Sequence, residues 1–266
     1  MRISRRDFIK GALALVAAAS LDSLLLEPQL TLTVERIELD FGGQSTLRIV
    51  LVADTHFTSD YISPSTEDAV RTIEDSKPDL IIMAGDLVSS ERGWASAKKF
   101  LSWLRSISPV VTVWGNHDHW HLTDLGTRAR ELRERDIMVL VNENLTFEGI
   151  HIVGVDDPFT GYSDLGKAVS GVKEGRRILV AHSPQIIGEA RDLFELVVSG
   201  HTHGGQVVIP LLGPPFIPLP AEYRKYTSGL YTVGNTKLYV NRGLGTSFFP
   251  IRFNCPPEVT MLSILI

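Results

Sequence analysis

LRIVLVADTH, residues 47–56, is the stretch that decides the fold of this chain. It opens with an apolar run rich in β-branched side chains, which predicts a strand buried on both faces. Asp54 and His56 follow directly, at the carboxyl end of that strand, where open α/β sheets place their ligand sites. The two side chains would share a face on a regular strand, although a turn at its end would change that geometry.

Four further blocks repeat this arrangement of an apolar run followed by oxygen or imidazole ligands. They are LIIMA-Gly85-Asp86, VVTVW-Gly115-Asn116-His117-Asp118, ILVA-His182 and LVVS-Gly200-His201-Thr202-His203. Taken singly, each polar residue has an ordinary structural explanation, such as a turn, a helix cap or a buried hydrogen-bonded histidine. Five blocks in this order predict a metal centre.

The donor chemistry of the set indicates which ions it would hold. Carboxylate, amide oxygen and imidazole suit borderline divalent ions such as Mn²⁺, Fe²⁺ or Zn²⁺. The candidate ligands are Asp54, His56, Asp86, Asn116, His182, His201 and His203. This set is too large for one ion that keeps an open position, and it fits two ions that share a bridging carboxylate.

The rest of the chain alternates predicted strands and helices. We expect helices at Ser65–Lys77, Trp94–Ile107, Asp124–Asp136 and Pro184–Leu193. Strands are expected at Leu30–Asp40, Leu47–Ala53, Leu80–Ala84, Val110–Trp114, Met138–Val141, Ile150–Val155, Ile178–Ala181 and Leu196–Ser199, and then at Gly204–Ile209, Leu230–Val233, Leu238–Asn241 and Val259–Ile266. This order predicts an α/β (α+β) fold, a four-layer α-β-β-α sandwich of two mixed sheets flanked by helices. We expect this fold to form one domain over residues 30–266.

Residues 1–19 look like an export signal and not part of the fold. The run SRRDFIK, residues 4–10, resembles the twin-arginine signal, and the apolar stretch after it ends in Ala17-Ala18-Ala19, an A-x-A-like cleavage site. Polar residues from Ser20 onward interrupt the apolar stretch, so we do not expect a membrane span, although an uncleaved anchor stays open. The expected partner is the twin-arginine translocation machinery, and the expected location is the periplasm, the cell wall or the outer face of the cytoplasmic membrane.

Composition narrows the function classes. The lone cysteine, Cys255, excludes an intramolecular disulfide and is expected to be a small buried residue. The formal net charge is −5, and removal of residues 1–19 makes it −8. A domain with this much negative charge is poorly suited to bind the phosphates of duplex nucleic acid. The charge therefore disfavours a nuclease.

The order D-x-H, G-D, G-N-H-D, H, G-H-x-H resembles the calcineurin-like metallophosphoesterase superfamily over about residues 47–205. The export signal, together with segments 203–206, 242–245 and 255–258, further resembles a twin-arginine-exported bacterial phosphoesterase or phosphodiesterase branch. The resemblance implies one ion on Asp54, His56 and His203, with Mn²⁺ the first expectation. It implies a second ion on Asn116, His182 and His201, with Asp86 bridging the two. Gly85-Asp86 lacks the Asp-Arg-Gly continuation of protein phosphatases, so that activity is not expected.

The same resemblance implies hydrolysis of phosphodiester or phosphomonoester bonds by a hydroxide held between the two ions. We expect His117 to be the general acid and Asp118 to orient it. His119 and His121 are expected in a solvated loop and not at a third metal. Two alternatives stay open: pyrophosphate cleavage of a nucleotide-linked lipid precursor, and a non-catalytic, metal-stabilised envelope-binding protein.

The substrate is the least determined feature. The apolar loop Leu211–Leu219 is expected to pack on the body, and a lipid-linked substrate with peripheral membrane contact is the alternative. Arg224, Lys225 and Arg242 are candidates to meet substrate phosphate, but surface charge explains them equally well.

Overall fold

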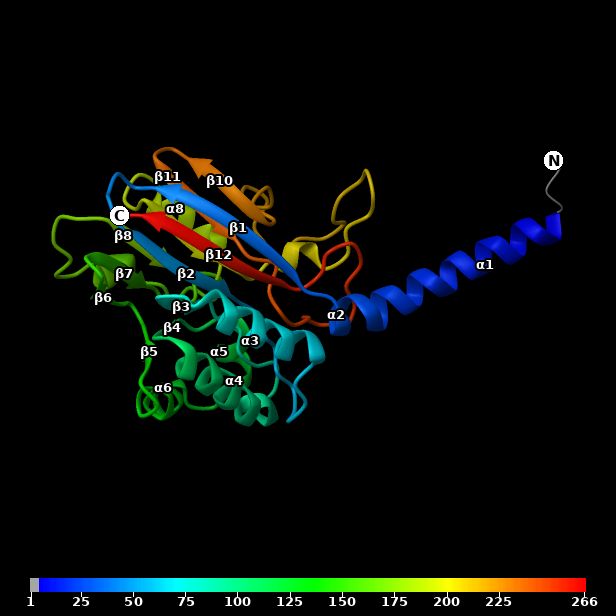
Figure 1. Cartoon of the computed structure of the whole chain (residues 1–266), viewed down its shortest axis with the longest axis horizontal. Coiled ribbons are helices and arrows are strands. Elements are labelled where there is room, and N and C mark those ends of the chain that lie inside the picture. Colours follow the sequence, from blue (N-terminus) through cyan, green and yellow to red (C-terminus); the bar gives the residue numbers. More distant parts are fainter. Residues whose placement is uncertain (1–4) are drawn as a thin grey trace.

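The computed structural model describes residues 5–266, which fold into two six-stranded sheets packed face to face (Figure 1). The first sheet has the order β1 (Thr33–Asp40), β12 (Glu258–Leu265), β2 (Thr46–Val52), β3 (Leu80–Met83), β4 (Val110–Thr112), β5 (Ile137–Val139). The second has the order β10 (Gly229–Val233), β11 (Thr236–Val240), β9 (Leu196–Ser199), β8 (Arg177–Val180), β7 (Ile150–Gly154), β6 (Glu143–Phe147). Each sheet combines parallel and antiparallel pairs, so both are mixed.

Strand β2 shows why both faces of the first sheet are buried. Its side chains alternate between the faces with the period of two that a strand imposes. Leu47, Ile49 and Leu51 pack in the core between the sheets, whereas Val50 and Val52 pack in the core under the outer helices. The prediction of a strand buried on both faces is therefore confirmed.

Helices cover the outer face of each sheet. The first sheet carries α3 (Pro64–Ser76), α4 (Trp94–Ile107) and α6 (Leu125–Arg133), and the second carries α7 (Leu165–Ala168) and α8 (Ile187–Ala190). Ser63 caps α3 by accepting a hydrogen bond from the Thr66 amide, and Pro64 fills its first position. The predicted four-layer α-β-β-α arrangement of two mixed sheets is confirmed.

Two element predictions need correction, and one strand was missed. The strand expected at Gly204–Ile209 is wrong, because positive φ angles from His203 to Gln206 turn the backbone away from an extended course. The helix expected at Pro184–Leu193 shortens to a 3₁₀ turn, Pro184–Ile186, followed by α8, and it ends before Asp192, whose φ is 65°. Strand β6, a polar edge strand, was not predicted at all.

The amino-terminal segment is a continuous helix that projects from the body in Figure 1. It comprises α1 (Arg5–Leu21), a π-helical turn (Asp22–Leu26) and α2 (Glu27–Leu30). We expected a stretch too short and too interrupted to cross a membrane. That expectation is wrong, because the helix is long and apolar enough to cross a membrane, by length and composition. A signal sequence meets the same criterion.

The helix joins the body near its end. The Arg252 amide donates to the Ser23 carbonyl over 2.9 Å, and the Glu27 carboxylate accepts the amides of Asn254 and Cys255. In contrast, the described side chains of residues 5–18 are exposed. The buried clusters of the fold therefore lie entirely beyond the signal segment.

Candidate metal centre

The carboxyl ends of strands from both sheets meet at one edge of the sandwich, and every predicted ligand lies there. β2, β3 and β4 of the first sheet lead into Asp54, Asp86 and Asn116, and β8 and β9 of the second lead into His182 and His201. The side chains that the structure brings together are all nearly inaccessible to solvent: Asp54, His56, Asp86, Asn116, His182, His201 and His203.

The backbone at this edge adopts an uncommon conformation. Asp54, His56, Asp86, His201 and His203 all have positive φ, between 47° and 71°. Left-handed backbone is costly for residues other than glycine and concentrates at functional sites, where the surrounding fold enforces it. The strands end in sharp turns here, so the spacing of Asp54 and His56 does not act as it would on a regular strand.

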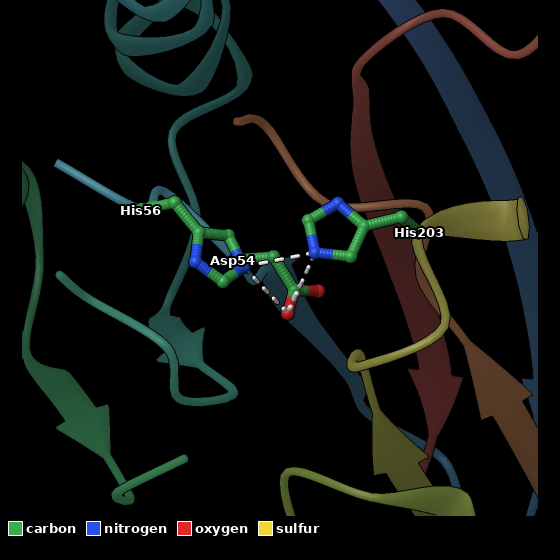
Figure 2. Close-up of side chains that lie close together, drawn as sticks. All are labelled: Asp54, His56 and His203. Atoms are coloured by element: carbon green, nitrogen blue, oxygen red, sulfur yellow. Dashed lines mark hydrogen bonds and ion pairs between the residues drawn. The ribbon is translucent and has the colours of Figure 1, made fainter. Parts of the chain in front are cut away.

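Asp54, His56 and His203 form the first group of donors (Figure 2). The Nε2 atoms of the two histidines lie 2.8 Å apart, and they lie 3.8 and 3.7 Å from Asp54 Oδ1. Burial lowers the pKa of His56 to about 3 and holds the pKa of His203 well below its usual value. Both rings are therefore neutral at pH 7, as metal-ligating imidazoles must be.

Asn116, His182 and His201 form the second group, with tautomers set by backbone carbonyls. His182 Nδ1 donates to the Ala84 carbonyl over 2.9 Å, and His201 Nε2 donates to the Pro218 carbonyl over 2.9 Å. The remaining ring nitrogens lie 3.1 Å from each other and 3.1 and 2.8 Å from Asn116 Oδ1. Such outer hydrogen bonds are how proteins orient histidine ligands.

Asp86 lies between the two groups. Its Oδ2 atom is 3.4 Å from His56 Nε2 and 3.2 Å from His182 Nε2, while Oδ1 accepts the His117 amide over 2.8 Å. Burial works against the ionised carboxylate, yet the His182 and His56 rings hold the pKa of Asp86 well below its usual range. A carboxylate whose Oδ2 atom reaches both groups has the position a bridging ligand requires.

The two groups fit divalent cations by the chemistry of their donors. In the second group, Asn116 Oδ1 and one nitrogen of each ring converge on one point, a repulsive arrangement unless a proton or a metal ion lies between them. Burial disfavours an imidazolium at His182, but the Asp86 and Asp54 carboxylates still raise the pKa of His182 to about 10. The pocket therefore attracts positive charge at its centre, and its residue clusters fit a dinuclear site.

His117 is the second residue of the short helix α5 (Asn116–His121), beside the ligands. Its Nδ1 lies 3.1 Å from Ser89 Oγ and its Nε2 lies 3.2 Å from Ser247 Oγ. Burial lowers the pKa of His117, so the free ring is neutral at pH 7.

The orienting role expected for Asp118 is wrong. Its carboxylate accepts the backbone amides of Leu87, Val88 and Gly115, so it holds the loop after β3 and not the His117 ring. Two serines contact that ring in its place.

The loop expected around His119 and His121 is instead part of α5. His119 Nε2 lies 2.7 Å from Asp156 Oδ1, and its ring stacks on Tyr162 at 4.3 Å.

Two clefts open on either side of His117, and both are lined by Trp120 and Phe248. One contains the aromatic rings of Phe159 and Phe216 above the second donor group. The other runs past His56 toward the end of the amino-terminal helix. The donors therefore lie at the floor of an accessible site with an aromatic wall.

Ser89, Ser247 and Arg252 are site residues that sequence reasoning missed. Arg252 is fully buried and donates to the carbonyls of the loop that backs Asp54. A local signal existed, because Arg252 is the only charged residue between residues 243 and 257. Arg242 pairs instead with Glu258 and Glu35, at 2.7 and 3.1 Å.

Cys255 is buried and free, as predicted. Its thiol donates to the His203 carbonyl over 3.2 Å.

A four-layer sandwich with buried groups of metal donors clustered at the strand ends fits a metal-dependent hydrolase. The calcineurin-like phosphoesterase family model matches residues 47–205, and this chain belongs to that family. Family membership supports hydrolase activity and the binding of divalent metals. The twin-arginine signal model matches residues 2–21, so the protein is exported to the periplasm or cell envelope.

Full-length relatives agree with this assignment. The chain is 32% identical over 277 residues to the phosphodiesterase YaeI of Escherichia coli (strain K12), with 99% of this chain and 100% of that protein covered. It is 30% identical over 285 residues to the uncharacterized metallophosphoesterase YkuE of Bacillus subtilis (strain 168), with 99% and 98% covered. The crystal structure of TT1561 of Thermus thermophilus superposes with a TM-score of 0.51 at 14% identity, covering 75% of this chain and 91% of that one, which shows a shared fold alone.

Proposed function

We propose that this protein is an exported, dinuclear-metal phosphoesterase that hydrolyses phosphodiester or phosphomonoester bonds. The observation that carries the proposal is the position of Asp86 between two groups of buried donors beneath an accessible cleft. Asp54, His56 and His203 would hold one ion, and Asn116, His182 and His201 the other.

Two divalent ions in these groups would supply the acidity that turns a shared water into a nucleophile and the charge that holds the ester oxygens. The donor set is one of hard oxygens and imidazoles, which suits Mn²⁺ first and Fe²⁺ or Zn²⁺ as alternatives. The outer hydrogen bonds of His182 and His201 direct the second nitrogen of each ring at the site, so an ion would displace the proton of His182 without turning either ring.

His117 would donate a proton to the leaving oxygen. It lines both clefts next to the donor groups, and its ring is held by Ser89 and Ser247. Burial lowers its pKa in the free protein, and an anionic ester beside the ring would raise that pKa. That coupling would place the proton on His117 when the substrate is bound.

We further propose that the exported form begins after Ala19, leaving residues 30–266 as the catalytic domain. The contacts of Ser23 and Glu27 with the loop at Arg252–Cys255 lie beyond that cleavage point. Cleavage would therefore leave the fold and the site intact.

Pyrophosphate cleavage of a nucleotide-linked lipid precursor is a second candidate. The cleft wall formed by Trp120, Phe159, Phe216 and Phe248 favours it, because aromatic rings accept either a base or an acyl chain. It uses the same donor groups and the same role for His117.

The test compares metal-loaded protein with His117→Gln on bis(p-nitrophenyl) phosphate and p-nitrophenyl phosphate. We expect kcat to fall about 10²- to 10⁴-fold, the usual contribution of general acid catalysis, with metal content unchanged. His151→Gln in β7 is the matched control and should behave as wild type. Equal turnover in His117→Gln would overturn the role of His117. Absence of turnover of either ester by protein that holds two ions would favour the envelope-binding alternative.

A further inference from the structure

Two neighbouring loops carry no charged side chain. Residues 206–220 and 243–251 contain no Asp, Glu, Lys or Arg, although 21% of the residues in the chain are charged. Ile217 and Leu219 pack into the body, as expected for this segment. The expectation of packing is wrong for Leu211, Leu212 and Phe216, whose side chains are between 66% and 106% exposed. In the second loop, Phe248 and Phe249 are 76% and 70% exposed. We call these five residues the apolar rim.

The two loops form one platform. The Gln206 side-chain amide donates to the carbonyls of Ser247 and Ile251 at 3.1 and 3.3 Å, and its oxygen accepts the Ser247 amide. The Val208 amide donates to the Phe253 carbonyl over 2.8 Å. The rim is therefore held in place by hydrogen bonds made behind it, between segments about 40 residues apart in the sequence.

The backbone presents the rim outward. Ile209 and Gly213 exchange backbone hydrogen bonds that close a tight turn, which places Leu211 at its tip. Leu211 and Phe248 both have left-handed backbone, with φ of 70° and 59°. This conformation is costly for bulky residues, and here it leaves apolar side chains in solvent.

The rim adjoins both the metal centre and the amino-terminal helix. Phe248 lies edge-on to His117 with ring centroids 5.5 Å apart. Phe249 lines the cleft that also contains Pro28 and Gln29, at the end of the helix long and apolar enough to cross a membrane. In Figure 1 the yellow loop that follows residue 205 projects at the end of the body from which α1 leaves.

We propose that the apolar rim docks on a lipid bilayer surface, so that the metal cleft takes its phosphate ester from the headgroup region of a membrane lipid. The choice of substrate rests on the proposed phosphoesterase function, whereas the docking does not. An exposed apolar patch that borders an active site and the exit of an apolar helix fits a membrane better than water. The net charge is −5 for the whole chain and −8 without residues 1–19, so attraction to anionic lipids does not drive the contact.

The test is co-sedimentation of the processed protein, residues 20–266, with phosphatidylcholine vesicles. This form retains every buried cluster of the fold. We expect binding that persists in high salt, because apolar insertion is not screened. Leu211→Ser/Leu212→Ser should weaken vesicle binding about tenfold or more, because the variant lacks two leucine side chains that insertion into the bilayer would bury. The matched control is Leu193→Ser/Leu230→Ser, two leucines exposed away from the rim, which should bind as wild type.

Activity separates this proposal from the proposed function. Leu211 and Leu212 line neither cleft, so turnover of bis(p-nitrophenyl) phosphate should be unchanged in their double variant. Hydrolysis of a vesicle-embedded phospholipid ester should fall with the binding. Wild-type protein that fails to bind vesicles, or that loses binding equally in the control, overturns the docking. A rim-dependent dimer without vesicle binding would assign the surface to a second copy of the chain. Rim-dependent binding without hydrolysis of any ester leaves the docking in place and overturns the substrate assignment.

Discussion

Arg252→Met is the substitution whose effect on stability follows most directly from the structure. The Arg252 side chain is fully buried, and it donates five hydrogen bonds of 2.5–3.1 Å to the carbonyls of Arg242, Gly243, Gly245 and Cys255. Methionine fills a similar volume but leaves these four carbonyls without their donor. The loop from Arg242 to Gly245 then loses its support.

The magnitude is a difference between two opposing terms. Hydrogen bonds from a charged donor contribute about 1.5–3 kcal/mol each, so the loss is on the order of 6–12 kcal/mol over four carbonyls. Much of it is offset, because methionine avoids the desolvation of a guanidinium, which costs several kcal/mol and lowers the pKa of Arg252. We expect a net loss of about 3–5 kcal/mol in the free energy of unfolding.

The same substitution should weaken metal binding. Gly245 donates its amide to the Asp54 carbonyl over 2.6 Å, and Leu244 donates to the Ala53 carbonyl over 2.9 Å. The loop that Arg252 holds therefore backs the first donor group, so its loosening displaces Asp54.

Urea denaturation of the wild type, Arg252→Met and Arg252→Lys measures the effect. Arg252→Lys keeps the charge with fewer donors and should fall between the other two. Arg71→Met is the control, since the Arg71 side chain is 68% exposed and its surface ion pairs contribute less than about 1 kcal/mol. An Arg252→Met variant within about 0.5 kcal/mol of wild type, the range of an ordinary surface substitution, would refute the reasoning.

Two further predictions concern the edges of the site. A Cβ on Gly115 would lie 2.2 Å from Asp86 Oδ1, so Gly115→Ala should cost about 1–3 kcal/mol in urea denaturation and lower metal content, while Gly126→Ala in α6 should be neutral or stabilising. Wild-type metal content in Gly115→Ala would contradict the geometry. Burial opposes charge on His119, but Asp156 at 2.7 Å raises the pKa of His119 above its usual 6.5. The stabilisation is therefore complete below the unfolded pKa and is lost as pH rises through the folded pKa. Asp156→Asn should lower the free energy of unfolding more at about pH 6 than at about pH 9, and an equal loss at both would argue against this pair.

The strand-end residues could be predicted because their signal is local. Asp54, Asp86, His182 and His201 each follow an apolar run that is recognisable within a few residues, and five such runs define the layered fold. Predicting that these side chains meet therefore required no knowledge of long-range contacts.

The residues that sequence reasoning missed depend on distant contacts. Ser247 reaches His117 across 130 residues, and Ser89 reaches it across 28, so neither has a local pattern. The strand expected after His203 failed for a related reason. Its apolar composition favours a strand, but the contacts that hold Gln206 in a left-handed conformation come from residues 247–253.

Exposure of the apolar rim was likewise not predictable. Ile217 and Leu219 are as apolar as Leu211 and Leu212, and only the tertiary structure separates the buried pair from the exposed one.

The central claim is that Asp86 joins two donor groups into one dinuclear site. Metal content per chain, measured with the electron paramagnetic resonance spectrum of Mn²⁺-loaded protein, tests it most directly in wild type and Asp86→Asn. We predict two ions per chain with an exchange-coupled manganese signal in the wild type, because two ions that share a carboxylate lie about 3.5–4 Å apart. Asp86→Asn should lose the coupled signal and at least one ion. A single uncoupled ion in the wild type, or an unchanged coupled signal in Asp86→Asn, would contradict the account.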